Sequence, residues 1–163
     1  MEYKVNYPEA GATRTGTLPP GYRHLERTAV LDATLPEAAD LLMTWGLHER
    51  CGLRPEASAE RAAPGVEVVL RFAGVLHIPC QVVWADETPD RVGFGYGSMP
   101  GHPETGEAAF LLEAADGRVR FTVRSFSRAG TVAARLGGPV ARFLRSRATD
   151  RFADAMRDAC LRT

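Results

Sequence analysis

Apolar residues recur with a period of two through the middle of the chain and with a helical period toward its C-terminal end. The alternation predicts strands, because successive side chains of a strand point to opposite faces. A shorter helical stripe, from Ala38 to Trp45, follows the capping sequence Thr34-Leu-Pro-Glu37 and ends at Gly46, which predicts one small helix after the first strand. The segments expected to form strands are residues 22–32, 66–72, 77–84 and 92–97 and the hairpin 107–126.

The clearest strand register surrounds Asp116-Gly117, a dipeptide that favours a two-residue hairpin turn. A turn at this point sets Leu112 opposite Phe121 and Phe110 opposite Val123 on one apolar face. A slip of one residue would mix apolar and polar side chains on that face. The turn chemistry and the hydrophobic pattern therefore predict the same pairing.

The strand at 77–84 is interrupted by Pro79, which has no N–H to donate to a neighbouring strand. It predicts an edge position or a bulge at that residue. Residues 47–65 are rich in Gly and Pro and are expected to add one short helical turn at most. The residues of this strand that are expected to share its apolar face are Ile78, Cys80, Val82 and Trp84.

The C-terminal segment returns to helical spacing, with an apolar stripe that includes Phe143, Leu144, Phe152 and Met156. We expect a long helix over residues 139–161. Gly137-Gly138-Pro139 either starts this helix or kinks a longer one that begins near Thr131.

Together these elements predict one α+β domain over residues 1–163, with an irregular N-terminal arm at 1–21. Strands joined by hairpins form an antiparallel sheet, and a sheet with one apolar face needs a cover. The C-terminal helix has the length and the stripe for this purpose. We therefore expect a curved antiparallel sheet of about six strands packed on the long C-terminal helix, with the small helix after the first strand.

The formal net charge of zero conceals two oppositely charged parts. Residues 118–163 hold eleven Arg against three Asp, a balance of +8, and residues 1–117 have a balance of −8. One interpretation is that the two parts neutralise each other, and another is an Arg-rich surface for an anionic partner. The segment lacks the Lys clusters and interleaved aromatic residues of nucleic-acid sites, so we do not expect nucleic acid as the partner.

Three widely spaced cysteines, with no Cys-x-x-Cys pair, argue against a structural zinc and favour a reducing compartment. The first residues have no signal-peptide pattern, and no apolar run is long enough to span a membrane. We expect a cytoplasmic protein with no cofactor and no metal. The sequence leaves the oligomeric state open.

The strongest candidate for a site is the strand in which Gly93, Gly95 and Gly97 alternate with apolar residues such as Tyr96. Glycines in a strand leave one face without side chains, which indicates close approach of a ligand, a helix or another backbone. The loop that follows contributes three titratable side chains suited to acid–base chemistry, and its Pro and Gly residues are equally typical of an ordinary turn. These three side chains are His102, Glu104 and Glu107.

Three further residues are candidates for ligand binding beside this loop. Tyr22 and His24 lie where the arm enters the first strand, and a structural hydrogen bond is the competing interpretation for His24. Arg142 begins the C-terminal helix, where it could bind a carboxylate or simply face solvent. His48-Glu49 lacks the second histidine of a His-Glu-x-x-His zinc site and is set aside.

Several short signatures, in order along most of the chain, carry a family resemblance. The chain resembles a bacterial and plant family known as a conserved domain of unknown function, with the helix-grip fold of the START-like superfamily. The resemblance implies a cavity between the sheet and the C-terminal helix, and it implies no established activity. The signatures are Tyr7-Pro-Glu-Ala-Gly-Ala-Thr-Arg14, Leu18-Pro-Pro-Gly-Tyr-Arg-His24, Gly93-Phe-Gly-Tyr-Gly97, Pro100-Gly-His-Pro-Glu-Thr-Gly-Glu107, Phe126-Ser127 and Leu136-Gly-Gly-Pro-Val-Ala-Arg142.

These observations favour a binding module that holds a small apolar or aromatic molecule between the sheet and the helix. One alternative is an enzyme on the same scaffold, with His102 or a neighbouring Glu as general base and Tyr22 or Tyr96 as proton donor. The other alternative is the Arg-rich interaction surface.

Overall fold

The computed structural model describes residues 2–72, 74, 76–130 and 138–160, with side chains in the last stretch from residue 147 onward. Over these residues, seven strands form one antiparallel sheet in the order β1-β7-β6-β5-β4-β3-β2. The strands are β1 (Arg23–Leu31), β2 (Arg54–Ala57), β3 (Glu67–Phe72), β4 (Leu76–Glu87), β5 (Arg91–Ser98), β6 (Glu104–Ala115) and β7 (Arg118–Ala129). The helices are η1 (Ala12–Arg14), α1 (Leu35–Met43), α2 (Gly46–Arg50) and α4 (Gly138–Ala159).

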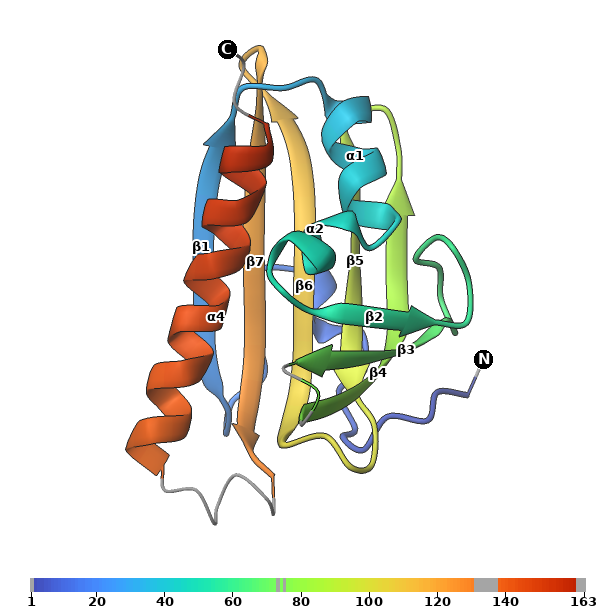
Figure 1. Ribbon diagram of the computed structural model, residues 1–163, viewed down its shortest axis with the longest axis vertical. Coiled ribbons are helices and arrows are strands. Elements are labelled where there is room, and N and C mark those ends of the chain that lie inside the picture. Colours follow the sequence, from blue (N-terminus) through green and yellow to red (C-terminus); the bar gives the residue numbers. More distant parts are fainter. Residues whose placement is uncertain (1, 73, 75, 131–137, 161–163) are drawn as a thin grey trace.

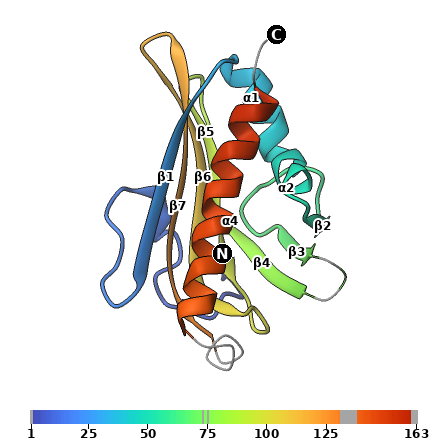
Figure 2. The ribbon, with the colours of Figure 1, turned by 60° about the vertical axis from the view of Figure 1, so that its left-hand side comes forward.

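The sheet curves around α4, which packs on one of its two faces (Figures 1 and 2). In Figure 1, β2 and β3 run across the direction of β5, β6 and β7, so the sheet encloses the helix from a second side. We call the face toward α4, α1 and α2 the inner face. The N-terminal arm and η1 lie on the opposite, outer face (Figure 2).

The β6–β7 hairpin has the register that the sequence predicts. Leu112 pairs with Phe121 and Phe110 with Val123, and all four side chains are buried in the main core. The turn residues Asp116-Gly117 have φ values of 51° and 75°. Two positive φ values in a two-residue turn match the right-handed twist of the flanking strands.

Helix α1 begins with the expected capping box. The side chain of Thr34 accepts from the Glu37 N–H at 3.4 Å, and the Thr34 N–H donates to the Glu37 carboxylate at 3.2 Å. The expected end at Gly46 is wrong, because Trp45 adopts the left-handed conformation (φ 69°) and Gly46 starts α2. A Cβ at Gly46 would lie 2.8 Å from Cδ1 of Leu41. A larger residue at this position would therefore require the Leu41 side chain to move.

The seventh strand, β2, was not expected from the sequence. Its four residues include Pro55 and lie in the Gly- and Pro-rich segment 47–65, where one short helical turn at most is expected. Pro55 pairs with Leu70 of β3, and β2 has no further neighbour in the sheet. Proline is tolerated at such an edge, because one side of the strand needs no donor.

Strand β4 also corrects two expectations. It lies inside the sheet, and its register shift falls between Val82 and Trp84 instead of at Pro79. Val82 pairs with Tyr96 and Trp84 with Gly95. The extra residue moves Trp84 to the outer face, away from the apolar face to which the alternation assigned it. The first residue of β4 that pairs with β5 is Cys80, so Pro79 lies one residue before this pairing begins.

Helix α4 agrees with the expected C-terminal helix to within two residues at each end. Met156 is fully buried, Phe152 packs against the main core, and Arg157 is exposed. The alternative start near Thr131, and the side chains of Phe143, Leu144, Arg142 and Arg145, lie outside the described part of the structure. Of the helices described, none is both long and apolar enough to cross a membrane.

Candidate functional site

A cavity of about 330 Å³ lies between the inner face of the sheet and α4. Strands β4, β5, β6 and β7 supply most of its wall, and α4 and the loop between β5 and β6 supply the rest. Most of the wall is apolar, with a small number of polar groups, as in most small-molecule sites. Its main apolar side chains are Ile78, Cys80, Tyr96, Phe110, Val123 and Phe152.

His102 lines this cavity from the loop between β5 and β6. Its Nδ1 accepts a hydrogen bond from the Glu104 N–H at 2.8 Å, so the proton of the neutral ring is on Nε2. Burial lowers the pKa of His102 to about 4. The ring is therefore an uncharged hydrogen-bond donor at neutral pH. Glu104 lines the same part of the wall.

Tyr96 also lines the cavity, and its hydroxyl lies 3.0 Å from Nε2 of His48 on α2. His48 is fully buried among aromatic rings, with the ring centroids of Phe110 and Phe152 each 5.0 Å away. Burial lowers the pKa of His48 to about 3 and raises that of Tyr96 well above 10. Both groups are neutral at pH 7, and together they form a fixed polar pair behind the aromatic wall.

Glu107 carries its carboxylate on the outer face, away from His102. It is 3% exposed, and its two oxygens accept from the Tyr7 hydroxyl at 2.6 Å, the Gly11 N–H at 2.7 Å and the Thr13 N–H at 2.9 Å. The Thr13 hydroxyl donates to the same carboxylate. Glu107 therefore anchors the N-terminal arm, and the three titratable side chains expected as one cluster are divided between the two faces of the sheet.

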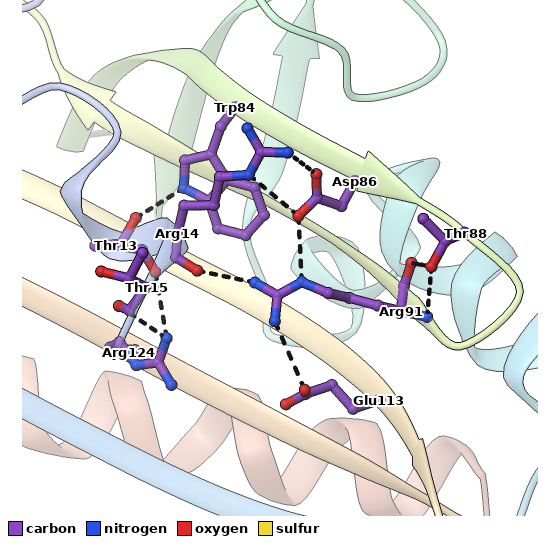
Figure 3. A network of polar contacts seen from close by, with 9 residues as sticks. All are labelled: Thr13, Arg14, Thr15, Trp84, Asp86, Thr88, Arg91, Glu113 and Arg124. Carbon is purple, nitrogen blue, oxygen red and sulfur yellow. Dashed lines mark hydrogen bonds and ion pairs between the residues drawn. The ribbon is translucent and has the colours of Figure 1, made fainter. Parts of the chain in front are cut away.

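A second set of contacts fixes the arm to the outer face (Figure 3). Nη1 of Arg124 donates to the backbone oxygens of Thr13 and Thr15 at 3.3 and 3.2 Å. Arg91 donates to the backbone oxygen of Arg14 at 2.8 Å and to Asp86 at 3.2 Å. Figure 3 shows both arginines directed at backbone oxygens of the arm, so the network holds the arm in place.

The glycine strand does make the close approach that its sequence indicates, and the approaching groups are the arm and Trp84 of β4. A Cβ at Gly97 would lie 1.9 Å from the Tyr7 hydroxyl, and one at Gly95 would lie 2.1 Å from Nε1 of Trp84 and 2.8 Å from the Thr13 hydroxyl. On the face opposite the cavity, Gly97 therefore makes room for the arm, and Gly95 makes room for Trp84 and Thr13.

Tyr22 and His24 also lie apart from the cavity. The Tyr22 ring packs against Phe126, with 4.9 Å between centroids, and its hydroxyl donates to Glu9 at 2.7 Å. His24 is exposed, and its Nε2 lies 2.7 Å from the backbone oxygen of Pro19. Of the nine residues expected to bind ligand, Tyr96, His102, Glu104 and Glu107 line the cavity, although the Glu107 carboxylate is held by the arm on the outer face. The side chain of Arg142 is outside the described residues.

Four polar residues that line the cavity, and His48 behind its wall, are not among the site residues predicted from the sequence; the four are Ser98, Ser125, Ser127 and Thr149. In the sequence, His48 is visible only as half of a zinc motif, and nothing in the local pattern reveals that it meets Tyr96. Ser125 shares by alternation the face of Phe121 and Val123, and a hydroxyl on that apolar face is itself a signal. Among the described residues, no three His, Cys, Asp or Glu side chains are grouped so that they could hold a metal ion.

Residues 6–155 match the family model described as a domain of unknown function (DUF1990). The chain belongs to this family. A relative, the UPF0548 protein of Deinococcus radiodurans, is 33% identical over 156 residues, which cover 85% of this chain and 79% of the relative. The family resemblance drawn from the sequence signatures is thereby confirmed.

Three solved structures share the fold at low sequence identity. The hypothetical protein jhp0584 from Helicobacter pylori has a TM-score of 0.70 and 10% identity, over 99% of this chain and 98% of that one. Ara h 8.0201 has a TM-score of 0.57 and 15% identity, over 86% and 98%. The Aha1 dimer from Colwellia psychrerythraea has a TM-score of 0.58 and 16% identity, over 85% and 96%. These similarities support a helix-grip-like α+β fold.

Proposed function

We propose that this protein binds one small, largely apolar molecule in the cavity between the sheet and α4. The observation that carries the proposal is the cavity itself, about 330 Å³ of space with mostly apolar walls and a few neutral polar groups. The cavity is partly open at the surface beside α4, so a molecule can enter it. Its mostly apolar lining with a few polar groups is therefore a reason to expect a ligand.

The volume limits the size of that ligand. It is near the lower end of the range for small-molecule pockets, and an apolar cavity of roughly 150 Å³ already accommodates benzene. The space at 330 Å³ suits a molecule of about two fused rings. A long acyl chain or a large cofactor would need more room.

The two alternatives have less support. The acid–base enzyme that would use His102, Glu104 and Glu107 loses one of its three groups, because the Glu107 carboxylate already accepts four hydrogen bonds from the arm. An Arg-rich surface for an anionic partner has less support, because at least one arginine of the basic part pairs with the acidic part, in the ion pair Arg124–Glu26. A cytoplasmic location remains part of this proposal, since the three cysteines are buried and unpaired.

The test is to fill the cavity. Ala108 lines it from β6, and Ala108→Phe would place a ring in the space. Thr28→Phe, at an exposed position of β1, is the matched control. In a fluorescence titration with naphthalene, we expect the wild type and the control to bind and Ala108→Phe to bind at least ten-fold more weakly. Equal binding by all three proteins, or no binding by the wild type, would refute the proposal.

A further inference from the structure

The cavity changes from apolar to polar along the direction of its strands. The pairs of β6 and β7 that follow one another on the inner face are Phe110 with Val123 and then Ala108 with Ser125. His102 lies beyond them, in the loop that leads into β6. All five residues line the cavity. One end therefore offers rings and a branched side chain, and the other offers hydrogen-bonding groups.

Ser125 supplies the first polar group at this end. Its residue is 9% exposed, and its buried hydroxyl oxygen has no hydrogen-bond partner within the described part of the chain. A buried polar group without a partner is rare in native proteins and needs an explanation. Because Ser125 lines the cavity, a polar atom of a bound ligand would provide the missing partner.

His102 supplies the second polar group. Since its Nδ1 accepts from the Glu104 N–H, its Nε2–H is a donor, and the described residues provide no acceptor for it. Histidine and serine can both donate to the same kind of ligand atom, an oxygen with lone pairs. Both donors are neutral, and a charged ligand group buried beside neutral donors would lack an ion-pair partner. A cation beside the Nε2–H of His102 is disfavoured as well, because the N–H group presents its positive end to the ligand.

We propose that the ligand is an uncharged amphiphile, a flat body of about two fused rings that ends in a hydroxyl or carbonyl oxygen. The rings occupy the end lined by Phe110 and Phe152, and the oxygen hydrogen-bonds with Ser125 and His102. This inference rests on the proposed function and adds the chemical class and the orientation of the ligand.

Three probes of matched shape test it, namely naphthalene, 2-naphthol and 2-naphthoate. Ser125→Ala and His102→Phe each remove one polar group with little change in shape, and Thr28→Ala on β1 is the control. Each of the two variants is expected to weaken 2-naphthol binding roughly five-fold, as for the loss of one neutral hydrogen bond. Binding of naphthalene should be unchanged, and the wild type should bind 2-naphthoate at least ten-fold more weakly than 2-naphthol.

The outcomes separate this inference from the proposed function. If no probe binds, the proposed function fails, and the inference fails with it. If naphthalene and 2-naphthol bind but neither variant affects 2-naphthol, the cavity is a ligand site and the polar subsite is refuted. Tighter binding of 2-naphthoate than of 2-naphthol would refute the uncharged class. Thermal unfolding of ligand-free Ser125→Ala gives a second readout, because removing an unpaired buried hydroxyl should leave the melting temperature unchanged or raise it.

Discussion

Glu107 is the residue on which the outer face depends. Its carboxylate accepts hydrogen bonds from Tyr7, Gly11 and Thr13, which lie between 94 and 100 residues away in the sequence. Each oxygen of the carboxylate faces two donors, so both oxygens must be acceptors. The residue thus converts an irregular segment of chain into a fixed cover for the sheet.

Glu107→Gln should destabilise the protein by about 2 kcal/mol, because the new amide would point N–H groups at donors that need an acceptor. The arm should also open more often, so trypsin should cleave after Arg14 faster than in the wild type. Urea unfolding and limited proteolysis measure the two effects. Glu113→Gln, at a partly exposed ion pair with Arg91, should change both by little. A loss below about 0.5 kcal/mol would contradict this account of the anchor.

His48 makes stability depend on pH. Its pKa is about 3 in the folded protein because of burial, against about 6.5 in an unfolded chain. Below pH 6.5 the unfolded state takes up a proton that the folded state does not, so the free energy of unfolding falls as the pH falls toward 3. Between pH 7 and 4.5 this effect amounts to about 2–3 kcal/mol. His48→Gln, neutral throughout, should lose that much less over the same range in urea unfolding, and an equal loss in both proteins would refute the assignment.

Among the elements, the β6–β7 hairpin contributes most to the inner core. Phe121 and Leu112 form one of its rungs, and both are fully buried. Phe121→Ala should destabilise the protein by about 3–5 kcal/mol, the usual cost of removing a buried aromatic ring. Val30→Ala, at a position of β1 that is 51% exposed, should cost under about 0.5 kcal/mol. Comparable losses for the two variants in urea unfolding would contradict the register.

The elements also show what a sequence can and cannot predict. The hairpin was predictable because Asp116-Gly117 and the alternation of apolar residues independently fix the same register. The strand β2 was not, because four residues that include Pro55 carry no periodic signal. The bulge that turns Trp84 outward was not predictable either, because the strand with its extra residue still reads as an ordinary run of apolar residues.

The candidate site was predictable only in part, for a related reason. Tyr96 and His102 could be placed near a cavity, because the apolar face of β5 and the loop after it are visible in the pattern. The role of Glu107 depends on which segment covers the outer face. Residues 1–21 have no periodicity that would indicate how they fold, so the contact between Glu107 and the arm is a purely tertiary feature.

For the whole molecule, α4 is both the cover of the inner face and a wall of the cavity. Deleting residues 139–163 would expose the apolar inner face to water, and an exposed patch of that kind promotes aggregation. We expect the truncated chain to be insoluble under conditions in which the full chain is soluble and unfolds cooperatively. Soluble expression of the truncated chain with a cooperative unfolding transition would refute the role given to α4.

The strand order also affects folding while the chain is being synthesised. The arm and β1 leave the ribosome before the other described strands, yet among those strands β1 pairs only with β7, and the arm is anchored on β6. Contacts between residues so distant in sequence form slowly, because a long loop must close before they contribute any stability. A nascent chain therefore carries an unpaired N-terminal strand until most of the protein has emerged. During that time β1 is open to pairing with other chains, and a chaperone that binds extended segments would protect it.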